Sequence, residues 1–321
     1  MAKLRAGIDL GGTKVQAIIA DARHKIVGEA RYATPTTGGA DAVVGALVAA
    51  VKEAAELAGV ETAELAGVGL GAPGDVDDKK GTIDNAGNLA GFDHPVPVAA
   101  MLKEELGVPV VRMGNDVSVA TAAEFELGAG RPFRSLLGVF WGTGVGGGLI
   151  LDGQEWSGRG GAGEIGHTVV KQGGARCQCG RLGCMEAYAG RRAMEAEAKR
   201  REDEGEKTIL FKLMRSRGRD RLTAGIWNRA LADGDKVARK VVDRAYVALG
   251  AGVASAVNLL DVEAVVLGGG VGTKLGDSAR ARLEQEMAPH LFNDDRPPQV
   301  LLVELGDLGG ALGAALLVKR G

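Results

Sequence analysis

The chain has 321 residues, a length that suits two domains of ordinary size better than one core. Apolar residues make up 45% of it and charged residues 25%, a mix that excludes a disordered chain. The 39 basic and 41 acidic residues give a formal charge of −2, and so near-neutral a balance argues against a nucleic-acid partner.

Two features of the apolar pattern bear on location. The first residues pass directly into a strand pattern and contain no apolar signal region. The longest uncharged apolar stretch runs from Ala245 to Leu260 and is shorter than the roughly 20 residues that a membrane crossing needs. We therefore expect a cytoplasmic protein without a membrane partner, in which this stretch forms a buried helix.

The first part of the chain predicts an α/β domain that begins with three consecutive antiparallel strands. The expected elements are strands at 4–10, 15–21 and 25–33, a helix at 41–58, a strand at 65–71, a loop reaching 97, a helix at 98–106 and a strand at 108–113.

From Ser135 on, SLLGVFWGTGVGGGLILD places two apolar runs around a glycine turn, as RAGIDLGGTKVQAIIAD does near the start of the chain. This similarity indicates a duplicated architecture, although a chain with 52 glycines also offers chance matches. The expected elements are then mainly helices over 186–260, a strand at 263–267, a helix at 276–288, a strand at 299–304 and a helix at 307–319. The charged residues from Arg191 to Arg221 are expected to form a solvated face without chemistry.

We place the domain boundary near Asn115. Residues 1–115 and 305–321 are expected to form a smaller N-terminal α/β lobe, because the last helix is expected to return to it. Residues 116–304 are then a larger C-terminal α/β lobe that contains all three cysteines of the chain.

Three glycine-rich turns are candidates for binding a nucleotide. In Asp9-Leu10-Gly11-Gly12-Thr13-Lys14, a strand delivers a carboxylate to a turn whose backbone N–H groups can hold an anion, and Asp9 could hold Mg²⁺ through water. The second turn is Gly142-Thr143-Gly144, and neither of these two has Walker or Rossmann spacing. The third, Gly268-Gly269-Gly270, would let the backbone lie against adenine or ribose. The alternative for each is an ordinary turn.

The pair Asn115-Asp116 follows an apolar strand, at the position where α/β folds place their ligands. Asp116 is therefore a candidate general base, which would accept the proton of an attacking hydroxyl during phosphoryl transfer. In the alternative, the pair only caps the following helix, at 117–127. The residues alone do not decide between the two.

All three cysteines, Cys177, Cys179 and Cys184, lie close together and shortly after His167. One histidine and three cysteines form a closed tetrahedral set for a structural zinc ion, whereas the alternative is a group of free cysteines. Glu164 and Glu186 flank the cluster, and carboxylates held rigidly there would accept hydrogen bonds from sugar hydroxyls. The alternative for both glutamates is that they are ordinary solvated surface residues.

Together these motifs resemble the ROK family (repressors, open reading frames and kinases) and, within it, the bacterial glucokinases. The resemblance spans the chain and rests on DLGGTK, Asn115-Asp116, GTGVGGG, GEIGH, CQCGRLGCME and LGGGV. It implies the actin-like ATPase (ribonuclease H-like) fold, an α/β fold with two lobes around a central cleft that holds MgATP and a hexose.

The resemblance also assigns roles to residues. It implies that glucose and ATP give glucose 6-phosphate and ADP, with Asp116 as the base for the 6-hydroxyl. The implied sugar contacts are Asn88, Asn115, Asp116, Glu164, His167 and Glu186. His167 would also bind the zinc ion with the three cysteines. We further expect a homodimer or homotetramer.

Departures from the family pattern leave the sugar preference open. The usual Asn-Leu-Pro-Gly-Trp is Asn88-Leu89-Ala90-Gly91-Phe92, so Asn88 is kept while the wall beside it is altered. Gly190 replaces a frequent serine, and Val117-Ser118 replaces a frequent Ala-Asn. N-acetylglucosamine, N-acetylmannosamine, mannose and fructose therefore remain possible acceptors.

The sequence favours other functions of the family less. Repressors of the family carry an extra N-terminal helix-turn-helix domain, whereas the first strand is expected to begin here by Leu4. A sugar sensor without activity would have no use for Asp116 as a base. Polyphosphate as donor would favour a cationic groove, which the near-neutral charge does not indicate.

Overall fold

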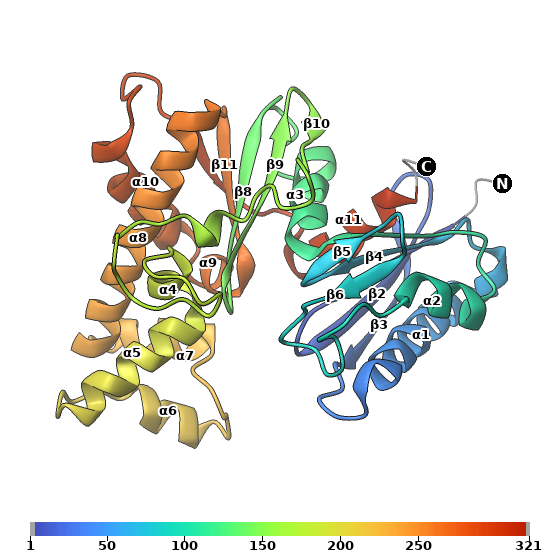
Figure 1. Cartoon of the computed structure of the whole chain (residues 1–321), viewed down its shortest axis with the longest axis horizontal. Coiled ribbons are helices and arrows are strands. Elements are labelled where there is room, and N and C mark those ends of the chain that lie inside the picture. The colour runs from blue at the N-terminus through green and yellow to red at the C-terminus, as the bar shows by residue number, and fades with distance from the viewer. Residues whose placement is uncertain (1–3, 319–321) are drawn as a thin grey trace. The chain divides into compact units, whose positions relative to one another are not determined.

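The computed structural model describes residues 4–318, which form two compact units (Figure 1). The first unit contains the residues up to Arg131, Ser157–Ala162 and the residues from Glu304 onward. The second contains Pro132–Trp156 and Gly163–Val303. The sequence predicts a boundary near Asn115. The first unit instead continues to Arg131 and so includes the helix that follows Asn115.

A five-stranded sheet in the order β3-β2-β1-β4-β7 forms the first unit. Its strands are β1 (Arg5–Leu10), β2 (Lys14–Ala20), β3 (Ile26–Ala33), β4 (Val68–Ala72) and β7 (Val111–Asn115). The prediction of three consecutive antiparallel strands is confirmed, and β4 and β7 run parallel to β1. A short antiparallel hairpin, β5 (Asp75–Asp77) and β6 (Thr82–Asp84), occupies the segment that was expected to be a loop.

Helices cover both faces of this sheet (Figure 1). Helices α1 (Gly39–Leu57) and α2 (Val98–Leu106) pack on one face, over the buried side chains of Ile8 and Leu10. Helices α3 (Asp116–Leu127) and α11 (Gly309–Leu317) pack on the other, and α11 contacts β1, β2, β4 and β7. The short 3₁₀ helices of this unit are η1 (Thr62–Glu64) and η4 (Gly306–Leu308).

The final helix lies unusually close to the sheet because glycines face it. A Cβ atom at Gly7 would lie 2.0 Å from the carbonyl oxygen of Ala311, and one at Gly69 would lie 1.7 Å from that of Ala314. Side chains alternate along a strand, so Asp9 lies on the same face as Gly7. The close packing of α11 therefore brings the beginning of that helix to the carboxylate of Asp9.

A second five-stranded sheet, in the order β10-β9-β8-β11-β12, forms the second unit. Its strands are β8 (Leu136–Trp141), β9 (Val145–Leu151), β10 (Gln154–Glu155), β11 (Ala264–Gly268) and β12 (Gln299–Leu302). As in the first sheet, an antiparallel hairpin with a glycine turn is followed by two strands parallel to its first strand. This shared arrangement agrees with the repeated pattern in the sequence.

The rest of the second unit is mainly helical, as predicted. Its helices are α4 (Glu186–Ala189), α5 (Arg191–Asp203), α6 (Leu210–Ser216), α7 (Ala224–Ala232), α8 (Lys236–Leu260), α9 (Gly269–Leu275) and α10 (Asp277–Met287), with the 3₁₀ helices η2 (Ile165–His167) and η3 (Ala288–His290). Within residues 4–318, none of the helices is both long and apolar enough to span a membrane.

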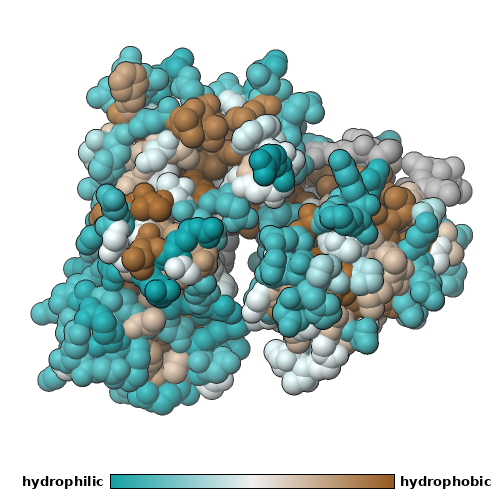
Figure 2. All heavy atoms as spheres, viewed as in Figure 1, coloured by the Kyte–Doolittle hydropathy of each residue, from teal (hydrophilic) through white to brown (hydrophobic). Residues whose placement is uncertain are grey.

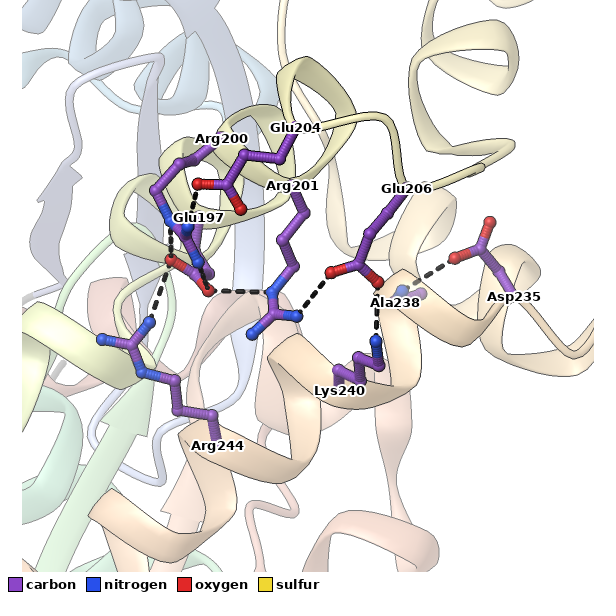
Figure 3. Close-up of polar contacts among 9 residues, drawn as sticks. All are labelled: Glu197, Arg200, Arg201, Glu204, Glu206, Asp235, Ala238, Lys240 and Arg244. Atoms are coloured by element: carbon purple, nitrogen blue, oxygen red, sulfur yellow. Dashed lines mark hydrogen bonds and ion pairs between the residues drawn. The ribbon is translucent and has the colours of Figure 1, made fainter.

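A network of charged side chains joins α5 to α8 (Figure 3), in a region whose visible face is strongly hydrophilic (Figure 2). Glu197 accepts hydrogen bonds from Arg200 and Arg201, and it lies 3.0 Å from the guanidinium of Arg244 on α8. The side chain of Glu197 is only 12% exposed. The hydrogen bond from Arg200, together with the charge of Arg244, lowers the pKa of Glu197 to about 2.

This network predicts a specific dependence of stability on pH. A carboxyl group whose pKa is lower in the folded state stabilises that state above its unfolded pKa of about 4.3. The stabilisation is then lost as the pH falls toward 2, which is the folded value. We expect Glu197→Gln to cost about 2 kcal/mol at pH 7, measured by urea unfolding, and to flatten the decline in stability between about pH 5 and pH 2.

The matched control is Glu204→Gln, on the same helix. Glu204 pairs with Arg200 but is 56% exposed, so this variant should change stability by less than about 0.5 kcal/mol. A decline with pH in Glu197→Gln as steep as that of the unmodified protein would contradict the assignment.

Candidate active site

The first glycine turn joins β1 to β2, and the fold brings Asn88 against it. The N–H of Gly11 donates to the carbonyl of Lys14 across the turn, at 2.9 Å. A Cβ atom at Gly12 would lie 2.9 Å from Nδ2 of Asn88, so only glycine allows this approach. Two of the predicted sites, the turn with Thr13 and the side chain of Asn88, therefore adjoin within the first unit.

Asp9 lies in a confined position at the end of β1. Its side chain is 20% exposed, with Nζ of Lys14 at 3.8 Å, and a Cβ atom at Gly310 of α11 would lie 2.8 Å from its carboxyl carbon. Burial raises the pKa of Asp9, although the charge of Lys14 opposes this rise. A carboxylate that is costly to ionise gains most from a nearby cation, so Asp9 suits the proposed role beside Mg²⁺.

Asn115 and Asp116 lie where β7 ends and α3 begins. Oδ1 of Asn115 accepts the N–H groups of Val117 and Ser118, at 3.0 and 3.2 Å, so Asn115 is the N-cap of α3. Asp116 is the first residue of the helix and is half-buried, and its Oδ1 accepts the N–H of Val117 at 2.9 Å. Asn115 thus caps α3, while its role as a sugar contact and the role of Asp116 as a base stay predictions.

Sheet order relates these residues to Asp9. Strands β1, β4 and β7 are parallel neighbours, with Asp9 opposite Gly71 and with Ala72 opposite Asn115. Their carboxyl ends therefore lie along the same edge of the first sheet. This is the edge at which α/β folds bind ligands.

In the second unit, the turn Gly142-Thr143-Gly144 is held by Glu186. The N–H of Val145, directly after the turn, donates to Oε2 of Glu186 at 2.9 Å. A Cβ atom at Gly144 would lie 2.1 Å from the same oxygen, so the carboxylate lies directly against the turn.

The third glycine site adjoins the second turn. A Cβ atom at Gly269 would lie 2.6 Å from the backbone of Trp141, and one at Gly142 would lie 3.8 Å from the nitrogen of Gly270. Gly268 pairs with Phe140 in the sheet, since β11 runs beside β8. The glycines at 268–270 therefore lie against the second turn, at the junction of β11 and α9, and their contact with adenine or ribose stays a prediction.

The histidine and the three cysteines meet at one point. Their potential ligand atoms all lie within 4.8 Å of one another. The Sγ atoms of Cys179 and Cys184 are 3.7 Å apart, and Sγ of Cys177 lies 3.7 Å from Nδ1 of His167. Tetrahedral zinc with Zn–S bonds of about 2.3 Å places two sulfur atoms about 3.8 Å apart, so the residues fit a zinc ion.

The two flanking glutamates differ in their surroundings. Glu186 is half-buried, and its Oε1 lies 3.8 Å from Sγ of Cys177. Glu164 is 58% exposed, and its Oε2 lies 3.9 Å from Nε2 of His167. One carboxylate therefore connects the cysteine cluster to the glycine turn, and the other faces the second ring nitrogen of the histidine.

Two residues near this site were missed by the sequence analysis. The hydroxyl of Tyr188 accepts the N–H of Ala175, at the start of the cysteine loop, and the guanidinium of Arg244 lies over the tyrosine ring at 4.6 Å. Arg191 was assigned to a solvated face, which is wrong for this residue, because it is only 8% exposed. Its N–H donates to the carbonyl of Gly142 and its guanidinium lies 3.4 Å from Oγ1 of Thr143, and no motif in the sequence signals this.

Comparison with known proteins agrees with this arrangement. The model of the ROK family matches residues 5–321. The chain belongs to the ROK family. It is 32% identical to a glucokinase from Halalkalibacterium halodurans, over 98% of this chain and 94% of the relative, and 32% identical to an N-acetylgalactosamine kinase from Shewanella, over 97% and 95%.

A solved structure of the same family has the same fold. It is a ROK glucokinase from Streptomyces griseus in complex with glucose and AMPPNP, with 34% sequence identity and a TM-score of 0.84. The similarity covers 99% of this chain and 100% of that one. The actin-like ATPase fold expected from the sequence is therefore confirmed.

Proposed function

We propose that this chain is an ATP-dependent hexose kinase, a glucokinase that converts glucose and ATP to glucose 6-phosphate and ADP. The observation that supports this most directly is the position of Glu186. Its two oxygens face the glycine turn at 142–144 and the cysteine cluster, so one side chain connects the expected nucleotide and sugar residues of the second unit. The full-length similarity to ROK glucokinases supports the same function.

In the proposed reaction, Asp116 accepts the proton of the 6-hydroxyl of the sugar while the 6-oxygen forms a bond to the γ-phosphorus of ATP and ADP leaves. The N–H groups of the turns at 11–14, 142–144 and 268–270 bind the nucleotide. Mg²⁺ held near Asp9 through water would neutralise charge on the phosphates. The sugar hydroxyls bind to Asn88, Asn115, Glu164, His167 and Glu186.

We infer that a structural zinc ion binds to His167, Cys177, Cys179 and Cys184. All four ligands come from the protein, so no position remains open for a reacting water. With Nδ1 of His167 toward the cysteines, Nε2 stays available to a sugar hydroxyl or to Glu164. The zinc ion would thus fix the orientation of a sugar-binding ring. A cytoplasmic location and a homodimer or homotetramer complete the proposal.

A kinase for another hexose is the second candidate. The N-acetylgalactosamine kinase of Shewanella is as similar in identity as the Halalkalibacterium glucokinase, and Ala90 and Phe92 replace residues of the usual sugar-side segment. This candidate is tested by measuring ADP release with glucose, mannose, fructose, N-acetylglucosamine, N-acetylmannosamine and N-acetylgalactosamine. Glucose is expected to give the highest kcat/KM, and a higher value for another sugar would replace it as the acceptor.

Replacing Asp116 tests its role as the base. We expect Asp116→Asn to lower kcat by about 10²–10⁴, because the amide cannot accept the proton, and to leave the Kd for glucose within about threefold. Asp41→Asn is the matched control, since Asp41 also lies in the first turn of a helix but is exposed. Undiminished turnover in Asp116→Asn would remove this residue from the mechanism.

Metal analysis tests the zinc site. We expect about one zinc ion per chain in freshly purified protein and a loss of both zinc and glucose affinity in Cys184→Ser. Leu182→Ser is the control, because Leu182 is in the same loop and 47% exposed, so it should keep its metal. Protein purified without zinc that still binds glucose normally would refute the site.

A further inference from the structure

Arg191 is a buried cation beside the second glycine turn. It is the first residue of α5 and is only 8% exposed, whereas the next residue, Arg192, is exposed and directs its guanidinium to Gln178. Arginine is rarely buried without a strong partner, because removing its charge from water is costly. The contacts of Arg191 should therefore explain why its charged side chain is buried.

The contacts that Arg191 makes in the described part of the chain are long. Its Nη1 lies 3.5 Å from Oε2 of Glu195 and 3.4 Å from the carbonyl oxygen of Leu222, and its Nη2 lies 3.4 Å from Oγ1 of Thr143. Charge-assisted N–H···O bonds are usually about 2.7–2.9 Å long. The guanidinium is thus enclosed by oxygen atoms that compensate its charge only weakly.

Nearby charges make this position less favourable still. Burial, followed by the charge of Arg221, lowers the pKa of Arg191, and Arg192 adds to the effect, while Glu195 and Asp220 oppose it without cancelling it. A buried guanidinium near two other cations is a group whose energy would fall on binding an anion.

The backbone fixes the guanidinium relative to the turn. The N–H of Arg191 donates to the carbonyl of Gly142 at 3.1 Å, and the N–H of Arg192 donates to that of Thr143 at 3.3 Å. The first residues of α5 are therefore bonded to the turn itself. The side chain of Arg191 lies beside Thr143, in the middle of a segment to which the proposed function assigns nucleotide binding.

We propose that Arg191 is a further nucleotide-binding residue of this kinase, whose guanidinium contacts the phosphate chain of ATP next to Thr143. The inference rests on the proposed function, since it takes the turn at 142–144 to be part of the nucleotide site. A guanidinium is suited to this role because its planar set of N–H donors matches two phosphate oxygens at once. The sugar-binding residues take no part in it.

Binding of a graded series of nucleotides tests the proposal. Inhibition or dissociation constants are measured for adenosine, AMP, ADP and ATP with the unmodified protein and with Arg191→Gln. We expect the variant to bind ADP and ATP about tenfold or more weakly and adenosine within about twofold. A role of Arg191 in holding the turn alone would weaken all four ligands by a similar factor.

Two further variants complete the experiment. Arg191→Lys keeps the charge without the planar donor set, so its affinity for ADP and ATP should lie between those of the unmodified protein and Arg191→Gln. It also tests the proposal if Arg191→Gln folds poorly. Arg192→Gln makes the same change of charge at the adjacent exposed position and should bind all four ligands like the unmodified protein. Zinc content and the Kd for glucose, which should not change, report on folding.

The outcomes separate this inference from the proposed function. If the unmodified protein binds ATP and Arg191→Gln weakens the four ligands equally or not at all, Arg191 does not contact phosphate and only this inference fails. If the unmodified protein neither binds ATP nor phosphorylates any hexose, the proposed function itself fails.

Discussion

The hydrogen bond between the N–H of Val145 and the carboxylate of Glu186 is the contact on which the second unit's site depends. It fixes one end of the glycine turn to the helix that follows the cysteine loop, while the N–H of Arg191 fixes the other end to the next helix. The other oxygen of Glu186 lies against Cys177. The cysteine loop, the carboxylate and the glycine turn are therefore mutually positioned, and none of them can shift without disturbing a half-buried polar contact.

The first unit positions its residues by a different means. Its sheet edge collects Asp9 and Asn115 because β1, β4 and β7 are parallel and adjacent. The last helix of the chain then lies directly on the sheet and encloses Asp9. In both units the first two strands along the chain form a hairpin with a glycine turn, so similar local sequences produce similar loops. The repeat in the sequence therefore corresponds to these two hairpins.

Much of the fold could be predicted because strands such as β1 and β2 are short apolar runs bounded by clear turns. The cysteine cluster was predictable from the spacing of residue types that have few other uses together. The hairpin β5–β6 was not, since its strands are three residues each and rich in aspartate. Arg191 was missed because charge in a helical segment predicts exposure, and only the fold shows that this one faces a turn some fifty residues earlier in the chain.

The glycines beneath α11 have a consequence for how this protein can evolve or be engineered. On the α1 face of the first sheet, Ile8 and Leu10 belong to an ordinary apolar core, where one aliphatic side chain can often replace another. On the α11 face, at Gly7 and Gly69, even a single methyl group would collide with main-chain oxygen. Redesign could therefore exchange side chains at Ile8 and Leu10 but not at Gly7 and Gly69, which lie on the side of the sheet that holds Asp9.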